Sequence, residues 1–467
     1  MQIEINTSAA PAEGVAVVSL TMGSELPASL VRTDGIAVSE LQVNIGAGPW
    51  EVERVVRQAV RAAVSFKLPA IQLNSADFIM LDRTLFSERS LGKMMARGAL
   101  MGAYVFDDYL TNGQAPMRIN LIGDDEAFLA GVQEGTVIGQ CVNEARTLSN
   151  TPANIATPAE LARCAHKMAA SEANITVRVL EDQGLKREDL NLIRAVGRGA
   201  RGTHGPRLIV IEYSGKPDND IQDVIIGKGV CYDTGGNSMK SSDNMPGMHR
   251  DKSGGVTVLK TIQALSQLKA RVNVVGLIPA VENSVDGDSY RPDDIIETAA
   301  GISVEVTNTD AEGRLILADA LWYAKRYCPD TVIDIATLTG AAHIALGDAY
   351  SGVFSTNKTL LRDLITAGEA GFDPLWELPL GPRYAHYLRS TQADIANACM
   401  SGKSGGASSA AWFLHRFAEK AGFAENYAHL DIAPRMVQVF PDEHLAPGSM
   451  GAGVSLFVEY FLSKQTP

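Results

Sequence analysis

Long apolar runs are absent from this 467-residue sequence. No uncharged stretch reaches the length of about eighteen residues that a membrane-spanning helix needs, so no span is expected. The opening residues, MQIEINTSAAPAEG, contain no basic segment that leads into an apolar one. They therefore do not predict a signal peptide, and a cytoplasmic protein is expected.

Cysteine is scarce, and no two cysteines form a CxxC pair. An odd number at wide spacing argues against a disulfide framework. It indicates packed thiols in a reducing compartment. The five residues are Cys141, Cys164, Cys231, Cys328 and Cys399.

Basic residues are outnumbered by acidic ones, 41 to 54, which gives a formal net charge of −13. This balance argues against general binding to nucleic acids or anionic membranes. A modest basic cluster, Arg83, Arg89, Lys93 and Arg97, is compatible with DNA binding, but such a cluster is more often a solvated helix face. Nucleic acid is therefore not an expected partner.

The length exceeds that of one ordinary core, so two domains are expected. Periodicity predicts strands at 14–22, 36–45, 70–74 and 117–123, and helices at 50–66, 88–106 and 124–148. The last helix stops before Pro152, and Thr157 is a candidate N-cap for the next one, with Pro158 at its first position. We place the boundary near residues 145–155. This gives an N-terminal α/β domain, 1–145, with an oligomerisation or regulatory role, and a catalytic domain, 146–467.

The second domain continues the alternation of strands and helices. Strands are predicted at 175–180, 206–215, 223–230, 271–281, 302–308 and 331–338, and helices at 160–170, 254–270 and 315–327. Continuous apolar strands that alternate with helices predict mostly parallel sheets flanked by helices in both domains. The fold class is therefore α/β.

Three unusual loops follow predicted strands: GKGVCYDTGG (227–236), NTDAEGR (308–314) and ATLTGA (336–341). Open α/β sheets bind ligands beyond the carboxyl ends of their strands. If these strands are neighbours, the loops open onto one edge of the sheet. This edge is the expected location of a functional site.

The loops concentrate acids and bases in a way that one helix start does not explain. Together with the segment that follows the first loop, they include Asp233, Asp251, Asp310 and Glu312. Buried carboxylates repel unless cations lie among them. Two divalent ions about 3.5–4 Å apart resolve the repulsion and form a hydrolytic centre. Few histidines are nearby, so an oxygen-rich site for Zn²⁺, Mn²⁺ or Mg²⁺ is expected, with His249 a loop residue rather than a ligand.

The motifs NTDAEGRL and GKGxxxDTGGxSxK together resemble the leucine aminopeptidase, or cytosol aminopeptidase, family. NTPANIATP, ATLTGA and AHLDIA extend the resemblance over the C-terminal part, and it is weak in the first 140 residues. It implies a dinuclear metallo-aminopeptidase that releases N-terminal, Leu-like residues from peptides. It also implies a homohexamer of two stacked trimers.

The resemblance also implies roles for individual residues. Asp233 and Glu312 would bridge both ions, Asp310 would bind one ion, and Lys228 and Asp251 would bind the other. Lys228 would have to be a neutral amine, with a pKa far below that of free lysine.

Two further residues match the catalytic residues of the family that do not bind metal. Lys240 would polarise the scissile carbonyl and stabilise the oxyanion, while water between the metals attacks. Arg314 would hold a bicarbonate or similar anion that moves the proton. Thr337, Leu338 and Gly340 match backbone contacts to the substrate, and Met248 matches the apolar side-chain pocket.

The sequence departs from the family pattern mainly in MPGMHRDKSGG. Lys252 there replaces an apolar neighbour of the metal centre, and the side-chain preference and metal affinity are both open to change. The other departures are Pro246, Gly247, His249, Arg250 and, near the C-terminus, Met450.

Two other functions compete with the peptidase. The first is a DNA-binding or regulatory protein on the same fold. The second is a two-metal phosphoesterase, which lacks its usual histidine-rich ligand set.

Overall fold

The computed structural model describes residues 3–6, 16–17, 29–32, 39–42, 50–80, 86–217, 223–399, 405–438 and 445–465. The chain divides into two compact units. The first contains residues 1–144 and 438–448, and the second contains residues 145–437 and 449–467. Among the described residues, no helix combines the length and apolar character that a bilayer crossing requires.

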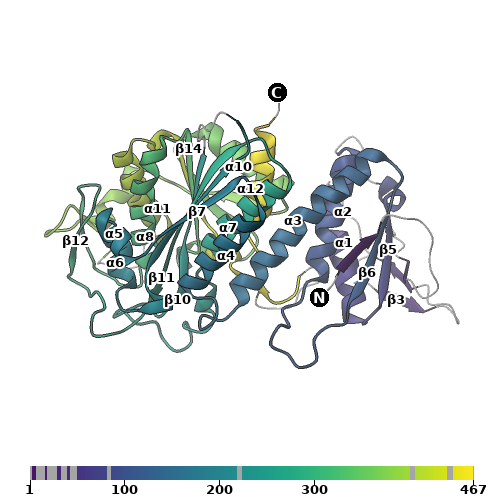
Figure 1. The fold of residues 1–467 in the computed structure, drawn as a ribbon, viewed down its shortest axis with the longest axis horizontal. Helices are drawn as coiled ribbons and strands as arrows, with labels where there is room; N and C mark the ends of the chain where they lie inside the picture. Colours follow the sequence, from purple (N-terminus) through teal and green to yellow (C-terminus); the bar gives the residue numbers. More distant parts are fainter. Residues whose placement is uncertain are drawn as a thin grey trace. The chain divides into compact units, whose positions relative to one another are not determined.

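The first unit is built on a parallel sheet with strand order β1-β6-β5-β2 (Figure 1). A hairpin of β3 and β4 is antiparallel, so the strand predicted at 36–45 pairs outside the parallel sheet. Valines and alanines of α1 pack with α2 and the strands into one buried core. The elements are β1 (Ile3–Asn6), β2 (Ala16–Val17), β3 (Ser29–Arg32), β4 (Ser39–Gln42), α1 (Trp50–Ser65), β5 (Ala70–Asn74), η1 (Ser75–Met80), α2 (Glu88–Ala103) and β6 (Met117–Ile122).

The basic cluster considered for DNA binding lies mainly on α2, where its described members are paired. Arg89 and Lys93 form ion pairs with Glu134, at 3.0 and 3.2 Å. Arg97 is buried and pairs with Glu53 at 2.6 Å. Arg83 lies outside the described residues. The structure therefore gives these three cations partners within the protein.

The second unit contains a nine-stranded sheet with order β16-β15-β18-β14-β9-β11-β8-β7, in which β10 also pairs with β11. The central strands β18, β14, β9 and β11 run parallel, whereas antiparallel pairs occur towards both sides. The bounds are β7 (Ile175–Leu180), β8 (Arg207–Ser214), β9 (Asp223–Gly227), β10 (Gly229–Asp233), β11 (Asn273–Asn283), β14 (Thr331–Ala336), β15 (Ser351–Ser355), β16 (Leu375–Glu377) and β18 (Tyr427–Asp431).

Helices cover both faces of this sheet, which is why its central strands are buried almost throughout (Figure 1). One layer contains α5 (Asp182–Arg187), α6 (Asn191–Gly197), α8 (Glu312–Ala324) and α11 (Gly406–Ala421). The other contains α4 (Pro158–Ser171), α7 (Ser253–Gln267), α10 (Lys358–Ala370) and α12 (Val454–Ser463). The α/β class with parallel-rich sheets is confirmed.

Helix boundaries follow local sequence signals. The predicted cap of α4 is confirmed, because Thr157 Oγ1 accepts from Glu160 N at 3.2 Å and Pro158 opens the helix. The long helix α3 (Glu126–Asn150) ends two residues before Pro152, close to the predicted stop.

The condition that the strands before all three loops are neighbours holds for two of them and fails for the third. The strand before NTDAEGR is only β13 (Ser303–Glu305), and it belongs to a separate small sheet with β12 (Ile295–Glu297) and β17 (Ile395–Ala396). The loops after β9 and β14 do open side by side, because these strands are parallel neighbours. The acidic loop reaches the same place through the start of α8 instead. A short apolar run does not encode which sheet it joins.

Candidate metal centre and active site

Lys228 lies between β9 and β10, where the sequence predicted one continuous strand. Its backbone is held on both sides, since its N–H donates to Ile335 O (3.0 Å) and its carbonyl accepts from Gly255 N (2.7 Å). A Cβ on Gly254 would lie 2.2 Å from Ile335 O, so only glycine lets α7 begin this close to the sheet. The backbone is thereby fixed, and the Lys228 side chain is buried.

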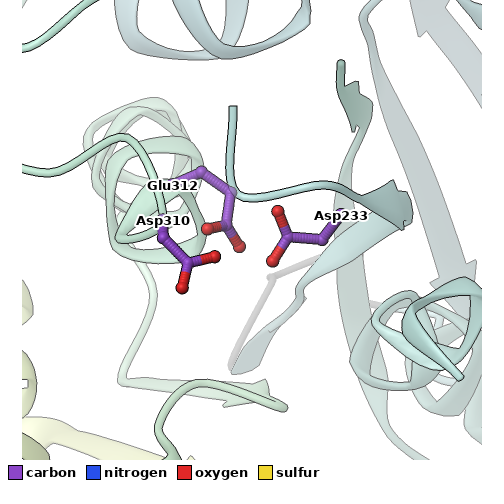
Figure 2. Close-up of side chains that lie close together, drawn as sticks. All are labelled: Asp233, Asp310 and Glu312. Carbon is purple, nitrogen blue, oxygen red and sulfur yellow. The ribbon is translucent and has the colours of Figure 1, made fainter. Parts of the chain in front are cut away.

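Three carboxylates converge beyond the carboxyl edge of the sheet. Oxygens of Asp233, Asp310 and Glu312 lie within 4.8 Å of one another. Figure 2 shows the three groups pointing toward one another from β10, from the loop before α8, and from the first turn of α8. Such a group can chelate a cation but is repulsive alone.

Asp251 joins the cluster through Lys228. The Lys228 ammonium lies 2.8 Å from Asp251 Oδ2 and 2.8 Å from Glu312 Oε1, and it donates to Thr337 O at 3.0 Å. Thr337 Oγ1 in turn donates to Asp251 Oδ1 at 2.6 Å. All five residues predicted as metal ligands are therefore gathered in one region, although Asp251 is not among the three mutually close carboxylates.

The glycine of NTDAEGR has a steric reason. Helix α8 begins at Glu312, three residues earlier than predicted, so Glu312 and Arg314 lie in its first turn. A Cβ on Gly313 would lie 2.6 Å from Lys228 Cε. Gly313 therefore lets the buried lysine pass alongside the helix and reach both carboxylates.

Negative charge exceeds positive charge in this cluster, with four carboxylates against Lys228 and Lys240. Burial raises the pKa of Asp251 well above its usual value, and burial and Glu312 raise that of Asp233. Burial, Glu312 and Asp233 raise the pKa of Asp310 to about 6. Burial opposes ionisation of Glu312, but the two lysines outweigh it and lower its pKa.

This donor set fits divalent cations. The carboxylates lack enough cationic partners, and hard oxygen donors suit Mn²⁺, Mg²⁺ and Zn²⁺. Burial alone would lower the pKa of Lys228, but Asp251 and Glu312 outweigh burial and raise it. The neutral amine expected from the sequence therefore requires added positive charge beside it, which a bound dication supplies.

Lys240 and Arg314 are placed differently from each other. Lys240 lies 2.8 Å from Asp233 Oδ2 and also pairs with Asp310. Arg314 NH1 donates to Asn397 O at 2.8 Å, while its buried Nε makes no hydrogen bond. Burial lowers the pKa of Arg314 to about 10, which leaves it charged at neutral pH. A buried guanidinium with an unused donor suits an anion such as bicarbonate.

The loop expected to contact the substrate is held by Asp431, a residue that the sequence analysis missed. Asp431, at the end of β18, accepts from Leu338 N at 3.1 Å and from Thr339 Oγ1 at 2.7 Å. Gly340 follows as the exposed first residue of α9 (Gly340–Leu346). Met248 is half-buried, and its carbonyl accepts from Asp251 N at 3.3 Å, one turn before that ligand.

Lys252, the main departure from the family pattern, is fully buried. Its ammonium donates to three backbone carbonyls, Ser149 O (3.3 Å), Thr151 O (2.9 Å) and His249 O. Burial lowers its pKa to about 8, and burial with its cationic neighbours lowers that of His249 to about 4. Lys252 thus joins the segment before α7 to the end of α3, and His249 is outside the carboxylate group.

Several residues that fix the acidic loop gave no signal in the sequence. Asn397 accepts from Thr307 N (2.8 Å) and donates to Asn308 O (2.7 Å). Asn283 and Tyr290 both donate to Thr309 O, at 3.0 and 2.7 Å. These contacts join positions far apart in the chain, so a local motif cannot reveal them.

The central strands of the open sheet are parallel, and the charged cluster lies beyond their carboxyl ends, where open α/β sheets bind ligands. This arrangement is typical of α/β enzymes. The model of the cytosol aminopeptidase family, catalytic domain, matches residues 143–458. The chain therefore belongs to the cytosol aminopeptidase family and is a peptidase of the hydrolase class.

Relatives support this assignment over most of the chain. A Geotalea uraniireducens protein named "Probable cytosol aminopeptidase" is 37% identical over 441 residues, which is 92% of this chain and 87% of the relative. A protein of the same name from Nitrosococcus oceani is 41% identical over 334 residues, 72% of this chain and 64% of the relative.

Solved structures share the fold of almost the whole chain. The "Bottromycin maturation enzyme BotP in complex with Mn" has a TM-score of 0.86 at 29% identity and covers 97% of this chain and 100% of its own. The cytosol aminopeptidase from Coxiella burnetii has a TM-score of 0.82 at 28% identity and covers 99% of both chains.

Proposed function

We propose that the protein is a dinuclear metallo-aminopeptidase that removes N-terminal, Leu-like residues from peptides. The observation that carries this proposal is the convergence of Asp233, Asp310 and Glu312 within 4.8 Å, with Asp251 tied to them through Lys228. These five side chains would hold two divalent ions, with Asp233 and Glu312 shared. The manganese complex of the related maturation enzyme supports Mn²⁺, and Zn²⁺ is the alternative.

The bound ions would supply Lewis acidity and an activated water. The chain's own residues do the remaining work. The Lys240 ammonium, held between Asp233 and Asp310, donates to the oxygen that gains charge as the peptide carbonyl is attacked. Arg314, whose buried Nε–H makes no hydrogen bond, would hold a bicarbonate or similar anion, and such an anion would supply a base for proton transfer. The Thr337–Gly340 backbone aligns the peptide, and Met248 lines its side-chain pocket.

The setting of this activity is also proposed. We expect a cytoplasmic homohexamer, because the matched relatives bear the name cytosol aminopeptidase and the resemblance implies hexamers. We assign catalysis to residues 146–467 and oligomerisation or regulation to residues 1–145.

A direct assay tests the proposal. Purified protein with added Mn²⁺ or Zn²⁺ should release leucine from Leu-p-nitroanilide and from unblocked dipeptides, but not from N-acetylated ones. Chelation should stop the release, and Glu312→Ala should abolish it. Release that persists in chelator, or cleavage of the blocked peptides at equal rate, contradicts the mechanism. A panel of N-terminal residues then defines the side-chain preference.

A further inference from the structure

A buried asparagine links the two loops that carry the carboxylate cluster. Asn283 is the last residue of β11 and is fully buried. Its Nδ2 donates to Asp233 Oδ1 at 2.8 Å and to Thr309 O at 3.0 Å. One amide group therefore contacts a predicted metal ligand on one loop and, on the other, the carbonyl just before Asp310.

The Asn283 contacts determine the direction in which Asp233 points. Asp233 Oδ1 accepts from Asn283 and from Gly235 N, at 2.8 and 2.9 Å, whereas Oδ2 faces Lys240 at 2.8 Å. The Asn283 Oδ1 is buried and accepts no hydrogen bond. Rotating the amide would place this oxygen against a carboxylate, so its nitrogen faces Asp233.

Thr309 completes the link between the loops. Its carbonyl accepts a second hydrogen bond, from the buried Tyr290 hydroxyl, at 2.7 Å. Its own hydroxyl donates to Gly235 O at 2.6 Å and accepts from Ser238 N at 2.7 Å. The positions of Asp233 and Asp310 relative to each other are therefore set by hydrogen bonds from the uncharged side chains of Asn283, Tyr290 and Thr309.

We propose that Asn283 is a positioning residue that orients Asp233 for metal binding and, through Thr309, fixes its spacing from Asp310. This inference rests on the proposed metal site. Groups that hydrogen-bond to metal ligands typically change metal affinity by about 10- to 100-fold when removed. Asn283 touches a predicted ligand, whereas the Tyr290 hydroxyl donates to the Thr309 carbonyl, so the two side chains should differ in effect.

Calorimetric titration with Mn²⁺ measures how much each side chain contributes to metal affinity. The variants are Asn283→Ala, Tyr290→Phe and the control Asn273→Ala. Asn273 is equally buried, at the opposite end of β11, and its Oδ1 accepts from Lys216 N at 2.8 Å. Asn283→Ala should weaken Mn²⁺ binding about 10- to 100-fold. Tyr290→Phe should weaken it less, by about three- to tenfold, and Asn273→Ala by less than about twofold.

A second readout separates positioning from stability. In chelator, the Tm of Asn283→Ala should fall no further than that of Asn273→Ala, and the absorption spectrum of bound Co²⁺ should change only in the former. The inference is overturned if Asn283→Ala binds Mn²⁺ like the wild type, or if the control weakens binding equally. If Asn283→Ala does not fold, the Mn²⁺ affinity of Tyr290→Phe is the test. Wild-type affinity in that variant would overturn the role of the Thr309 hydrogen bonds. A wild-type protein that binds no metal refutes the proposed function instead.

Discussion

Each unit of the molecule contains a buried charged cluster, and the two clusters are built oppositely. In the first unit, both carboxylate oxygens of Glu53 face arginines, Arg57 through one oxygen and Arg97 through the other. In the second unit, four carboxylates share two lysines. The first cluster satisfies its acid within the protein, whereas the second is left short of positive charge.

The choice of base is as informative as the balance of charge. Arginine stays protonated under all ordinary conditions, so Arg57 and Arg97 can only form ion pairs. Lysine can release its proton and offer a lone pair to a metal. A closed cluster of arginines therefore indicates a structural role, and an acid-rich cluster with lysines indicates a cation site.

The largest effect should follow from removing an acid of the second cluster. Glu312→Gln keeps the volume but removes a shared ligand, so kcat/KM on Leu-dipeptides in Mn²⁺ should fall at least about 1000-fold, or ~4 kcal/mol. Glu369→Gln, at an exposed position on α10, is the control. Retention of more than a tenth of the activity would reject Glu312 as a ligand.

The matching change in the first cluster should act on stability alone. Glu53→Gln leaves two buried arginines without their carboxylate, which should cost about 3–5 kcal/mol of unfolding free energy. Denaturant unfolding measures this loss. The Mn²⁺ dissociation constant of the folded variant should match that of the wild type. Weaker Mn²⁺ binding by folded Glu53→Gln would contradict the proposed difference between the two clusters.

Exchanging the bases sharpens the comparison. Lys228→Arg keeps a positive charge near Asp251 and Glu312 but removes the amine that can lose its proton. One of the two Mn²⁺ ions should then bind at least about 100-fold more weakly. This is a larger loss than usually follows when a group that hydrogen-bonds to a metal ligand is removed. Calorimetric stoichiometry measures it, with Lys228→Met as the uncharged reference. Two tightly bound ions in Lys228→Arg would exclude Lys228 as a ligand.

Another buried acid, Asp319 in α8, has no ion pair among the described residues, so it should affect the pH dependence of stability and not activity. It accepts from Ile193 N at 2.9 Å, and burial raises its pKa to about 8. The folded protein therefore holds a proton that the unfolded chain releases near pH 4, so this contribution to stability is complete below that pH. It is lost as the pH rises through about 8, by at most ~1.4 kcal/mol per pH unit.

Asp319→Asn keeps the hydrogen-bond acceptor and cannot titrate. In chelator, its Tm should therefore rise relative to the wild type between pH 5 and pH 8, and the difference should level off above that range. Tm profiles that stay parallel across this range would show that Asp319 is ionised throughout.

The sequence was most informative where chemistry is concentrated in short motifs. Asp233, Asp310, Glu312 and Lys228 could be predicted to lie together, because their short motifs combine acids with bases and because the carboxylates need cations among them. The sequence could not reveal side chains that hydrogen-bond to backbone atoms far away in the chain. Asn283 lies two residues beyond the strand predicted at 271–281, and only the folded chain brings it to Thr309.

Two other differences have physical reasons. The run before NTDAEGR is apolar enough for a strand but too short to specify its partner, so its place in the small sheet was not predictable. The sequence placed Lys252, a cation, where the family has an apolar neighbour of the metal centre, and left the side-chain preference and metal affinity open. The long side chain of Lys252 reaches the carbonyls of Ser149 and Thr151.

The central claim is that the acid-rich cluster is a two-metal site. Anomalous scattering from crystals grown with Mn²⁺ tests it most directly. We expect two peaks about 3.5–4 Å apart, with Asp233 and Glu312 touching both. A map with no peak among Asp233, Asp251, Asp310 and Glu312, in crystals whose protein is folded and saturated with Mn²⁺, would contradict it.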